Sequence, residues 1–326
     1  MQIFYISKDL GFPYRTSFWE LGMSLEIIRP VLVDVTVPAI LLGCSAIRTY
    51  GSKFCWMVWI LGLAVYTIYT FIKREWFLFG YYLRYGLLLG FVIVFVISLR
   101  SIMDVPLCMT MSLDEIAGIS FLLLFLTFTL IVLGDKRHVK MSIDATFPLR
   151  EGHYYIAQGG GNAIINHHAP AEYSKYAIDI LKINTYGFRA KGFYPKDLQK
   201  YFIFEELVYS TVEGTVIKVI EDHPDMTPPC LDKEHPAGNH IITRHTGSGA
   251  LIFLAHLRQR SILATEGDVV KEGQAIARVG NSGLSTEPHL HIHCEEDEVG
   301  ELNVYGKGIP LLFDGRFLKR NDVVKC

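Results

Sequence analysis

The stretch EGDVVKEGQAIARVGNSGLSTEPHLHIH, residues 266–293, decides the fold of the second half of the chain. Its short β-branched runs are separated by glycines at turn positions, which is typical of small antiparallel β structures. It ends in His289, His291 and His293, and a strand directs alternate residues to one face. Catalytic zinc usually takes three protein ligands and a water. The pattern therefore favours a metal centre over a polar, solvent-facing strand.

The same β texture continues on both sides and predicts an all-β domain over residues 147–300, an antiparallel sheet in a barrel-like sandwich. Candidate strands lie at 154–158, 176–181, 214–221, 240–245, 251–257, 275–280 and 289–295. Biotinyl and lipoyl carrier domains share this texture. They present a lysine at a hairpin tip, and no such lysine lies between 213–219 and 266–280. We therefore disfavour a carrier domain.

Polar side chains also interrupt other apolar segments. Asp179 lies in YAIDIL, and a buried carboxylate without a partner is costly, so a metal is an attractive partner. His256 lies in LIFLAHL and, taken alone, would be a structural core histidine. His167 and His168 lie upstream of both, in GGGNAIINHHAP. Separate strands thus each deliver one histidine or aspartate, which favours a shared site.

The segments GNHIITRH, LIFLAHL and 266–293, in this order, resemble the lysostaphin/LytM-type zinc metallopeptidases of peptidase family M23. The resemblance covers about residues 147–297 and is most specific over 279–293. It implies a LytM-type β fold and zinc ligands comprising an upstream histidine, Asp179 and His291. It also implies catalytic roles for His256 and His289. His293 matches no family role, and we expect a bystander or a group that supports a ligand.

The upstream ligand departs from the usual HxxxD spacing of the family. Lys175 stands four residues before Asp179, while His167 and His168 lie twelve and eleven residues before it. The resemblance includes members with an NxH…YAxD arrangement, so we expect His168 as the ligand and keep His167 as the alternative. If neither histidine reaches the metal, the domain is inert.

The activity implied by the resemblance is zinc-dependent hydrolysis of peptide bonds in bacterial cell-wall peptidoglycan. Zinc would activate a water, and His256 and His289 would share proton transfer and stabilisation of the oxyanion. The alternatives are an inert LytM-like domain that binds wall or regulates another hydrolase, and a transporter-like membrane protein with an accessory domain. The insertion at 181–207 either walls a substrate groove or is a simple connection.

The first half of the chain predicts an α-helical transmembrane region at residues 1–134. The chain has 326 residues, of which 50% are hydrophobic and 20% charged. Clear spans are expected at 54–72, 77–99 and 116–133, and a doubtful fourth at 30–47 contains Asp34 and Pro38. We expect Asp34 and Arg84 to be interfacial residues of an anchor rather than parts of a transport pathway. No removable signal peptide is expected.

The orientation of the spans follows from the substrate rather than from the charges. Four spans with the C-terminal half outside leave three Lys or Arg residues inside and eight outside, against the positive-inside rule. Three spans with the N-terminus inside leave six inside and five outside, which hardly favours either orientation. A wall substrate places the domain outside a bacterial membrane, after a juxtamembrane linker at 135–146 and before an extension at 301–326.

The net charge of −2 argues against nucleic acid as a partner, and the lipid bilayer is the expected partner. Without CxxC spacing, the six cysteines predict no particular disulfide.

Overall fold

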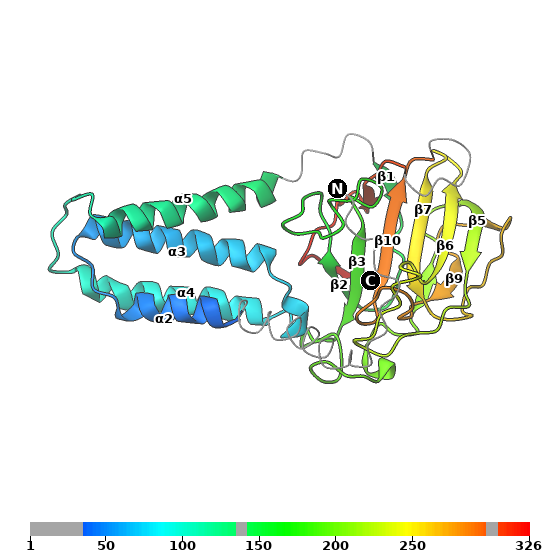
Figure 1. Cartoon of the computed structure of the whole chain (residues 1–326), viewed down its shortest axis with the longest axis horizontal. Coiled ribbons are helices and arrows are strands. Elements are labelled where there is room, and N and C mark those ends of the chain that lie inside the picture. Colours follow the sequence, from blue (N-terminus) through cyan, green and yellow to red (C-terminus); the bar gives the residue numbers. More distant parts are fainter. Residues whose placement is uncertain (1–34, 135–141, 298–305) are drawn as a thin grey trace, which may run out of the picture.

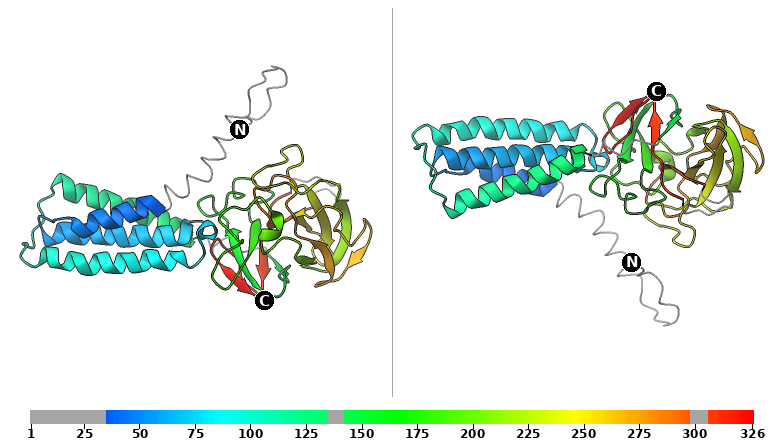
Figure 2. Two further views of the ribbon diagram at one scale, coloured as in Figure 1. Left: turned by 90° about the horizontal axis from the view of Figure 1, so that it is seen from below. Right: turned by 90° about the horizontal axis from the view of Figure 1, so that it is seen from above.

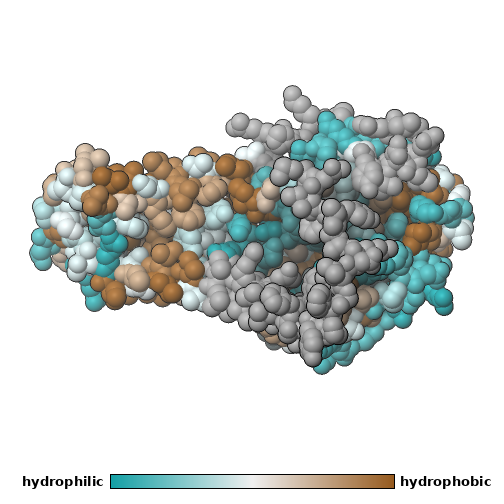
Figure 3. Space-filling view, in the orientation of Figure 1, coloured by the Kyte–Doolittle hydropathy of each residue, from teal (hydrophilic) through white to brown (hydrophobic). Residues whose placement is uncertain are grey.

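The computed structural model describes residues 35–134, 142–297 and 306–326, which form a bundle of helices followed by a β domain (Figure 1). The helices lie side by side along the long axis of the molecule, and the β domain covers one end of the bundle in all views (Figures 1 and 2). On the face shown in Figure 3, apolar residues form large areas on the bundle, and polar residues are frequent on the uncovered parts of the β domain.

The bundle consists of α2 (Val37–Ile47), α3 (Lys53–Lys73), α4 (Leu83–Leu99) and α5 (Leu113–Leu133). Among the described residues, three helical segments are long and apolar enough to cross a membrane, namely Lys53–Lys73, Leu83–Ile102 and Leu113–Leu133. The doubtful span at 30–47 lies partly outside the described residues, as does Asp34. The described helix α2 has 11 residues and measures only about 16 Å at 1.5 Å per residue.

Small residues and caps account for the packing of the bundle. At Gly62 on α3, an added Cβ would stand 2.8 Å from Phe121, and at Gly118 on α5 it would stand 3.0 Å from Trp59, so these glycines allow close approach of the two helices. A capping box of Ser112 and Glu115 begins α5. The Arg48–Asp114 ion pair lies at the same end of the bundle, remote from the β domain.

The expected span at 77–99 begins too early. Helix α4 begins at Leu83, and the residues before it form a short 3₁₀ turn, η2 (Trp76–Leu78), and a loop. These aromatic residues pack against protein, because Phe77 and Tyr81 contact a buried cluster of the β domain around Tyr155 and Leu181. Arg84, expected at an interface, donates to the carbonyl of Asn321 at 3.3 Å.

The β domain is built on an eight-stranded sheet in the order β12-β2-β3-β10-β7-β6-β5-β8, and all of its pairs are antiparallel. In chain order the bounds are β2 (His153–Gln158), β3 (Ile178–Ile183), β5 (Gly214–Ile220), β6 (Asn239–His245), β7 (Leu251–Leu257), β8 (Val269–Val270), β10 (Leu290–Glu295) and β12 (Val323–Lys325). The expected antiparallel β domain is thus confirmed.

Two short strand pairs complete the domain. Strand β4 (Leu207–Tyr209) pairs with β9 (Ala275–Arg278), and β1 (Ile143–Ala145) pairs in parallel with β11 (Leu311–Phe313). Strands β11 and β12 come from the segment expected to be an extension, and β1 comes from the expected linker. Both segments therefore contribute to the β domain.

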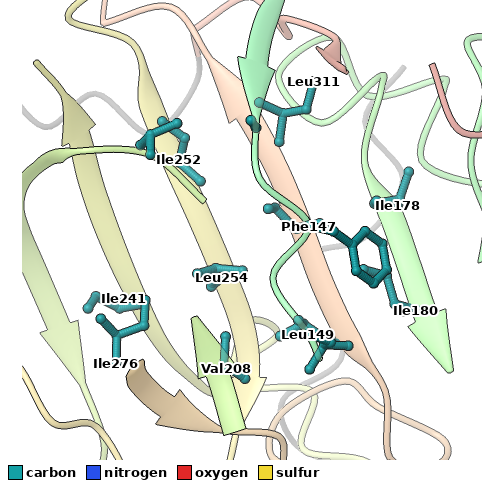
Figure 4. Packing of buried hydrophobic residues seen from close by; sticks show 14 of the residues in the cluster. Phe147, Leu149, Ile178, Ile180, Val208, Ile241, Ile252, Leu254, Ile276 and Leu311 are labelled. Atoms are coloured by element: carbon teal, nitrogen blue, oxygen red, sulfur yellow. The ribbon is translucent and has the colours of Figure 1, made fainter. Parts of the chain in front are cut away.

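The main core lies on one face of the large sheet, and the other face carries two smaller apolar clusters as well as polar side chains. Ile178 and Ile180 of β3, together with Ile252 and Leu254 of β7, point into one cluster with Phe147 and its neighbours (Figure 4). Because side chains alternate along a strand, the residues between them face the opposite side. That opposite face carries the histidines and the aspartate expected to form the site.

Candidate active site

Strand pairing brings Asp179 and His291 together. Strands β3 and β10 are neighbours, and these two residues are directly opposite in the register. Ile178, Ile180, Leu290 and Ile292 point to the core, so the Asp179 and His291 side chains share the other face. Nδ1 of His291 lies 2.8 Å from Oδ1 of Asp179.

The loop between β2 and β3 delivers His168 to the same carboxylate. Buried Asn166 closes this loop: its Nδ2 donates to the carbonyls of Gly160 and Ala177 at 2.7 and 3.0 Å, and its Oδ1 accepts from the His168 backbone N–H. Nε2 of His168 consequently lies 3.1 and 3.0 Å from the two oxygens of Asp179. The eleven-residue separation between His168 and Asp179 is thus bridged by a closed loop.

His167 lies at the edge of the same group. Its Nε2 is 3.9 Å from Oδ2 of Asp179, and its side chain is 62% exposed, compared with 18% for His168. One donor atom from each of His167, His168 and Asp179 falls within 4.8 Å of the others. Both histidines therefore remain near the carboxylate, and His168 is the closer and more buried one.

His256 and His289 form a pair beside the carboxylate, with ring centroids 4.7 Å apart. Nδ1 of His256 is 2.9 Å from the carbonyl of Ser282, and Nδ1 of His289 is 2.9 Å from the carbonyl of Glu287. A carbonyl only accepts, so each Nδ1 carries the proton. In the neutral ring each Nε2 is then a free base, and that of His289 lies 3.8 Å from Asp179.

The backbone of His256 has an uncommon conformation. Its φ is +60°, in the left-handed region that non-glycine residues rarely adopt. His256 comes just before the end of β7, and its N–H donates to the carbonyl of Ala237 at 3.2 Å. Such local strain is common at functional sites. At His256 it occurs where the ring packs beside that of His289.

Burial and neighbouring charges set the protonation of the group. Burial alone would raise the pKa of Asp179, but His168 and His289 outweigh it and hold that pKa well below its ordinary value. Burial first, and then His289, lowers the pKa of His256 well below its ordinary value. Burial likewise lowers the pKa of His291. These shifts favour an ionised Asp179 and neutral His256 and His291 rings, and metal binding requires ligands in these forms.

His293 supports His291 from behind. Its Nδ1 lies 2.9 Å from Nε2 of His291, and its ring stacks on Phe253 with centroids 4.5 Å apart. Of the two expectations for His293, bystander or supporting group, this contact favours the second. Ligand histidines usually engage their other nitrogen in such a hydrogen bond, which fixes the tautomer and orientation of the ring.

Several residues that shape the site were not among the sequence candidates. Asn166 closes the His168 loop, Ser282 holds His256, and Glu287 holds His289 through its carbonyl. The Glu287 side chain forms a buried ion pair with Arg189, at 2.7 Å, from the insertion at 181–207. That insertion is therefore in contact with the wall of the site rather than a free connection.

Comparison with known proteins found similarity over part of the chain. The model of peptidase family M23 matches residues 204–302, a range that includes His256, His289 and His291. Two peptidoglycan DD-endopeptidases of Vibrio cholerae serotype O1 are similar: ShyB is 37% identical over 84 residues and ShyA 32% over 85. Each match covers 26% of this chain and 16% of the relative, so the chain spans about a sixth of their length.

Similar solved structures were also found. A zinc-containing peptidase from Vibrio cholerae is 25% identical with a TM-score of 0.28, covering 45% of this chain and 35% of that one. The catalytic domain of the prophage-encoded M23 protein EnpA from Enterococcus faecalis is 18% identical with a TM-score of 0.30, covering 48% of this chain and 87% of that one. Over residues 204–302, the sequence of this chain is therefore similar to peptidase family M23.

Proposed function

We propose that this protein is a membrane-anchored zinc metalloendopeptidase that hydrolyses peptide bonds of bacterial peptidoglycan. The observation that carries the proposal is the convergence of His168 and His291 on the Asp179 carboxylate, at 3.0 and 2.8 Å, next to the His256–His289 pair. The DD-endopeptidase activity named for the two similar Vibrio proteins supports peptidoglycan as the substrate class.

The donor set fits zinc. Two imidazoles and one carboxylate are ligands that zinc accepts in catalytic sites. Asp179 is 6% exposed, and within the described part of the chain its recorded hydrogen bonds and ion pairs are all with histidine rings. Imidazole rings bind a metal in their neutral form, so a buried carboxylate surrounded by such rings is well compensated by a bound cation. We therefore assign His168, Asp179 and His291 as the zinc ligands.

His256 and His289 supply the proton transfer. Zinc in this site would polarise a water and the carbonyl of the peptide bond. Each of the two histidines holds a free Nε2, because its Nδ1 proton is committed to a backbone carbonyl. One ring can accept a proton from the attacking water and return it to the leaving amine, and the other can stabilise the developing negative charge.

The placement outside the membrane follows from the substrate. Helices α3, α4 and α5 are apolar enough to span a bilayer, and the β domain covers the bundle end where α3 and α5 finish and α4 begins (Figure 1). Peptidoglycan lies outside the cytoplasmic membrane. We therefore place that end of the bundle, together with the β domain, at the outer surface of a bacterial membrane.

Metal content and cleavage measured on the same sample test the proposal. Purified full-length protein should bind one zinc per chain and release peptide-cleavage products from purified sacculi. Asp179→Asn, which keeps the side-chain shape, should lose both zinc and cleavage. A fully zinc-loaded wild type that cleaves neither directly cross-linked nor bridged sacculi would contradict the enzyme and favour an inert, wall-binding domain.

A further inference from the structure

The insertion between β3 and β4 interlocks with the segment that joins α3 to α4. The backbone N–H of Tyr81 donates to the carbonyl of Gly187 at 2.9 Å, and the rings of Phe79 and Phe193 lie 5.8 Å apart. Gly80 has a φ of +96°, and a Cβ there would stand 3.0 Å from the Phe188 ring. The insertion is thus fitted to the end of the helical hairpin.

Buried polar contacts fix this junction in place. Arg189 is 3% exposed; it pairs with Glu287 and donates to the carbonyl of Phe77 at 3.4 Å. On the other side of the junction, Nδ2 of Asn321 donates to the carbonyls of Ile72 and Arg74 at 2.7 and 2.9 Å. The insertion is therefore held at the level where α3 ends and α4 begins.

Exposed aromatic side chains gather at this level. Among the residues that the structure describes, the exposed phenylalanine, tyrosine and tryptophan side chains are Tyr82, Tyr85, Tyr186, Phe188 and Phe193. All belong to the first turn of α4, the residue before it, or the insertion, and their exposed fractions run from 46% to 75%. The rest of the described β domain surface exposes no aromatic ring of these three kinds.

Aromatic rings at the ends of membrane helices are typical of the boundary between lipid and water, where the apolar ring and polar edge are both accommodated. The insertion continues this belt beyond the helices. It also exposes Lys191, Lys196 and Lys200, and cationic side chains are attracted to anionic headgroups. We propose that residues 184–200 are a lipid-contact surface that lies in the headgroup region of the bilayer.

This surface also reaches the active site. The Tyr194 hydroxyl donates to the carbonyl of Thr286 at 2.8 Å, and Arg189 holds Glu287, two residues before His289. The wall of the site is thus tied to the membrane surface. The inference rests on the proposed function and narrows its substrate class to peptides that lie close to the outer face of the bilayer.

Photocrosslinking in vesicles tests the lipid contact directly. The full chain, carrying p-benzoylphenylalanine in place of Tyr186, is reconstituted in vesicles of phosphatidylethanolamine and phosphatidylglycerol, irradiated and examined by mass spectrometry for lipid adducts. The same group in place of Leu124, exposed on α5, is the positive control. The group in place of Leu263 is the negative control: Leu263 is exposed in the connection before β8, whose partner β5 lies remote from the helices (Figure 1).

Lipid adducts are expected at positions 186 and 124 and not at 263. Adducts at 124 without adducts at 186 would overturn the lipid-contact surface and leave the membrane anchor intact. Equal adducts at 186 and 263 would also overturn it, because the contact would not be specific to the insertion. Absence of adducts at 124 would remove the membrane anchor itself, and the surface with it. Peptide cleavage is not needed for any of these readouts.

Discussion

At the scale of single residues, one carboxylate organises the site. His168 and His291 contact the two oxygens of Asp179, and the His256–His289 pair lies beside it. The alternation of HLHIH along a strand predicts that His289, His291 and His293 share a face. Their contacts nevertheless differ. Nδ1 of His291 lies within hydrogen-bond distance of Asp179, whereas His293 contacts the other ring nitrogen of His291.

The choice of upstream ligand can be tested by zinc binding. His168→Ala should lose zinc as Asp179→Asn does, because Nε2 of His168 lies 3.0 Å from the carboxylate. His167→Ala should keep zinc, since its ring is 3.9 Å away and mostly exposed. Metal content after dialysis against a weak chelator measures both. Retention of zinc by His168→Ala and its loss by His167→Ala would move the ligand to His167.

The contact behind His291 predicts a different effect at His293. His293→Ala should weaken zinc binding about 10–100-fold, as loss of such supporting hydrogen bonds typically does. His293→Asn, which can still hydrogen-bond Nε2 of His291, should restore part of the affinity. Competition with a chelator measures the affinity, and cleavage at saturating zinc should stay near the wild-type rate. An unchanged zinc affinity in His293→Ala would show that the ring is a bystander.

At the scale of elements, strands β3 and β10 position Asp179 and His291, and the loop between β2 and β3 positions His168. The β10 strand and the apolar context of Asp179 could be predicted because they follow from local patterns. The distance from His168 to Asp179 could not, since it depends on how Asn166 closes a loop. The Arg189–Glu287 pair joins residues 98 positions apart, a contact that no local pattern encodes.

The Arg189–Glu287 pair should matter strongly for stability. Arg189→Leu leaves the Glu287 carboxylate buried without its partner, which typically costs about 3–5 kcal/mol. The double variant Arg189→Leu/Glu287→Leu should be less destabilised than the single one. Thermal unfolding measures both, with Arg260→Leu as the control because the Arg260–Asp222 pair is solvent-exposed. A melting temperature for Arg189→Leu equal to that of Arg260→Leu would contradict the prediction.

At the scale of the whole molecule, the bundle and the β domain are joined through a specific junction. The sequence predicts the apolar helices from length and composition, but it places the start of α4 too early. Trp76, Phe77 and Tyr81 are apolar enough to extend a span, and they instead pack beside the β domain. Composition cannot distinguish an aromatic ring buried against lipid from one buried against protein.

The proposed orientation can be read from a native thiol. Cys230 is exposed in the loop between β5 and β6. A variant that keeps Cys230 and replaces the other cysteines with serine should react with a membrane-impermeant maleimide in intact cells. Where an outer layer blocks the reagent, spheroplasts are used instead. A variant without any cysteine is the control. Labelling of Cys230 only after lysis would place the β domain in the cytoplasm, out of reach of the wall.

The most direct test of the account is the cleavage of purified sacculi by His256→Ala and His289→Ala at measured zinc occupancy. Neither residue is assigned as a ligand, so both variants should keep one zinc per chain. Loss of a proton-transfer group typically lowers the rate about 10²–10⁴-fold. His245→Ala, at a partly buried histidine at the end of β6, should cleave like the wild type. Zinc-loaded His256→Ala and His289→Ala that also release wall peptides at the wild-type rate would contradict the account.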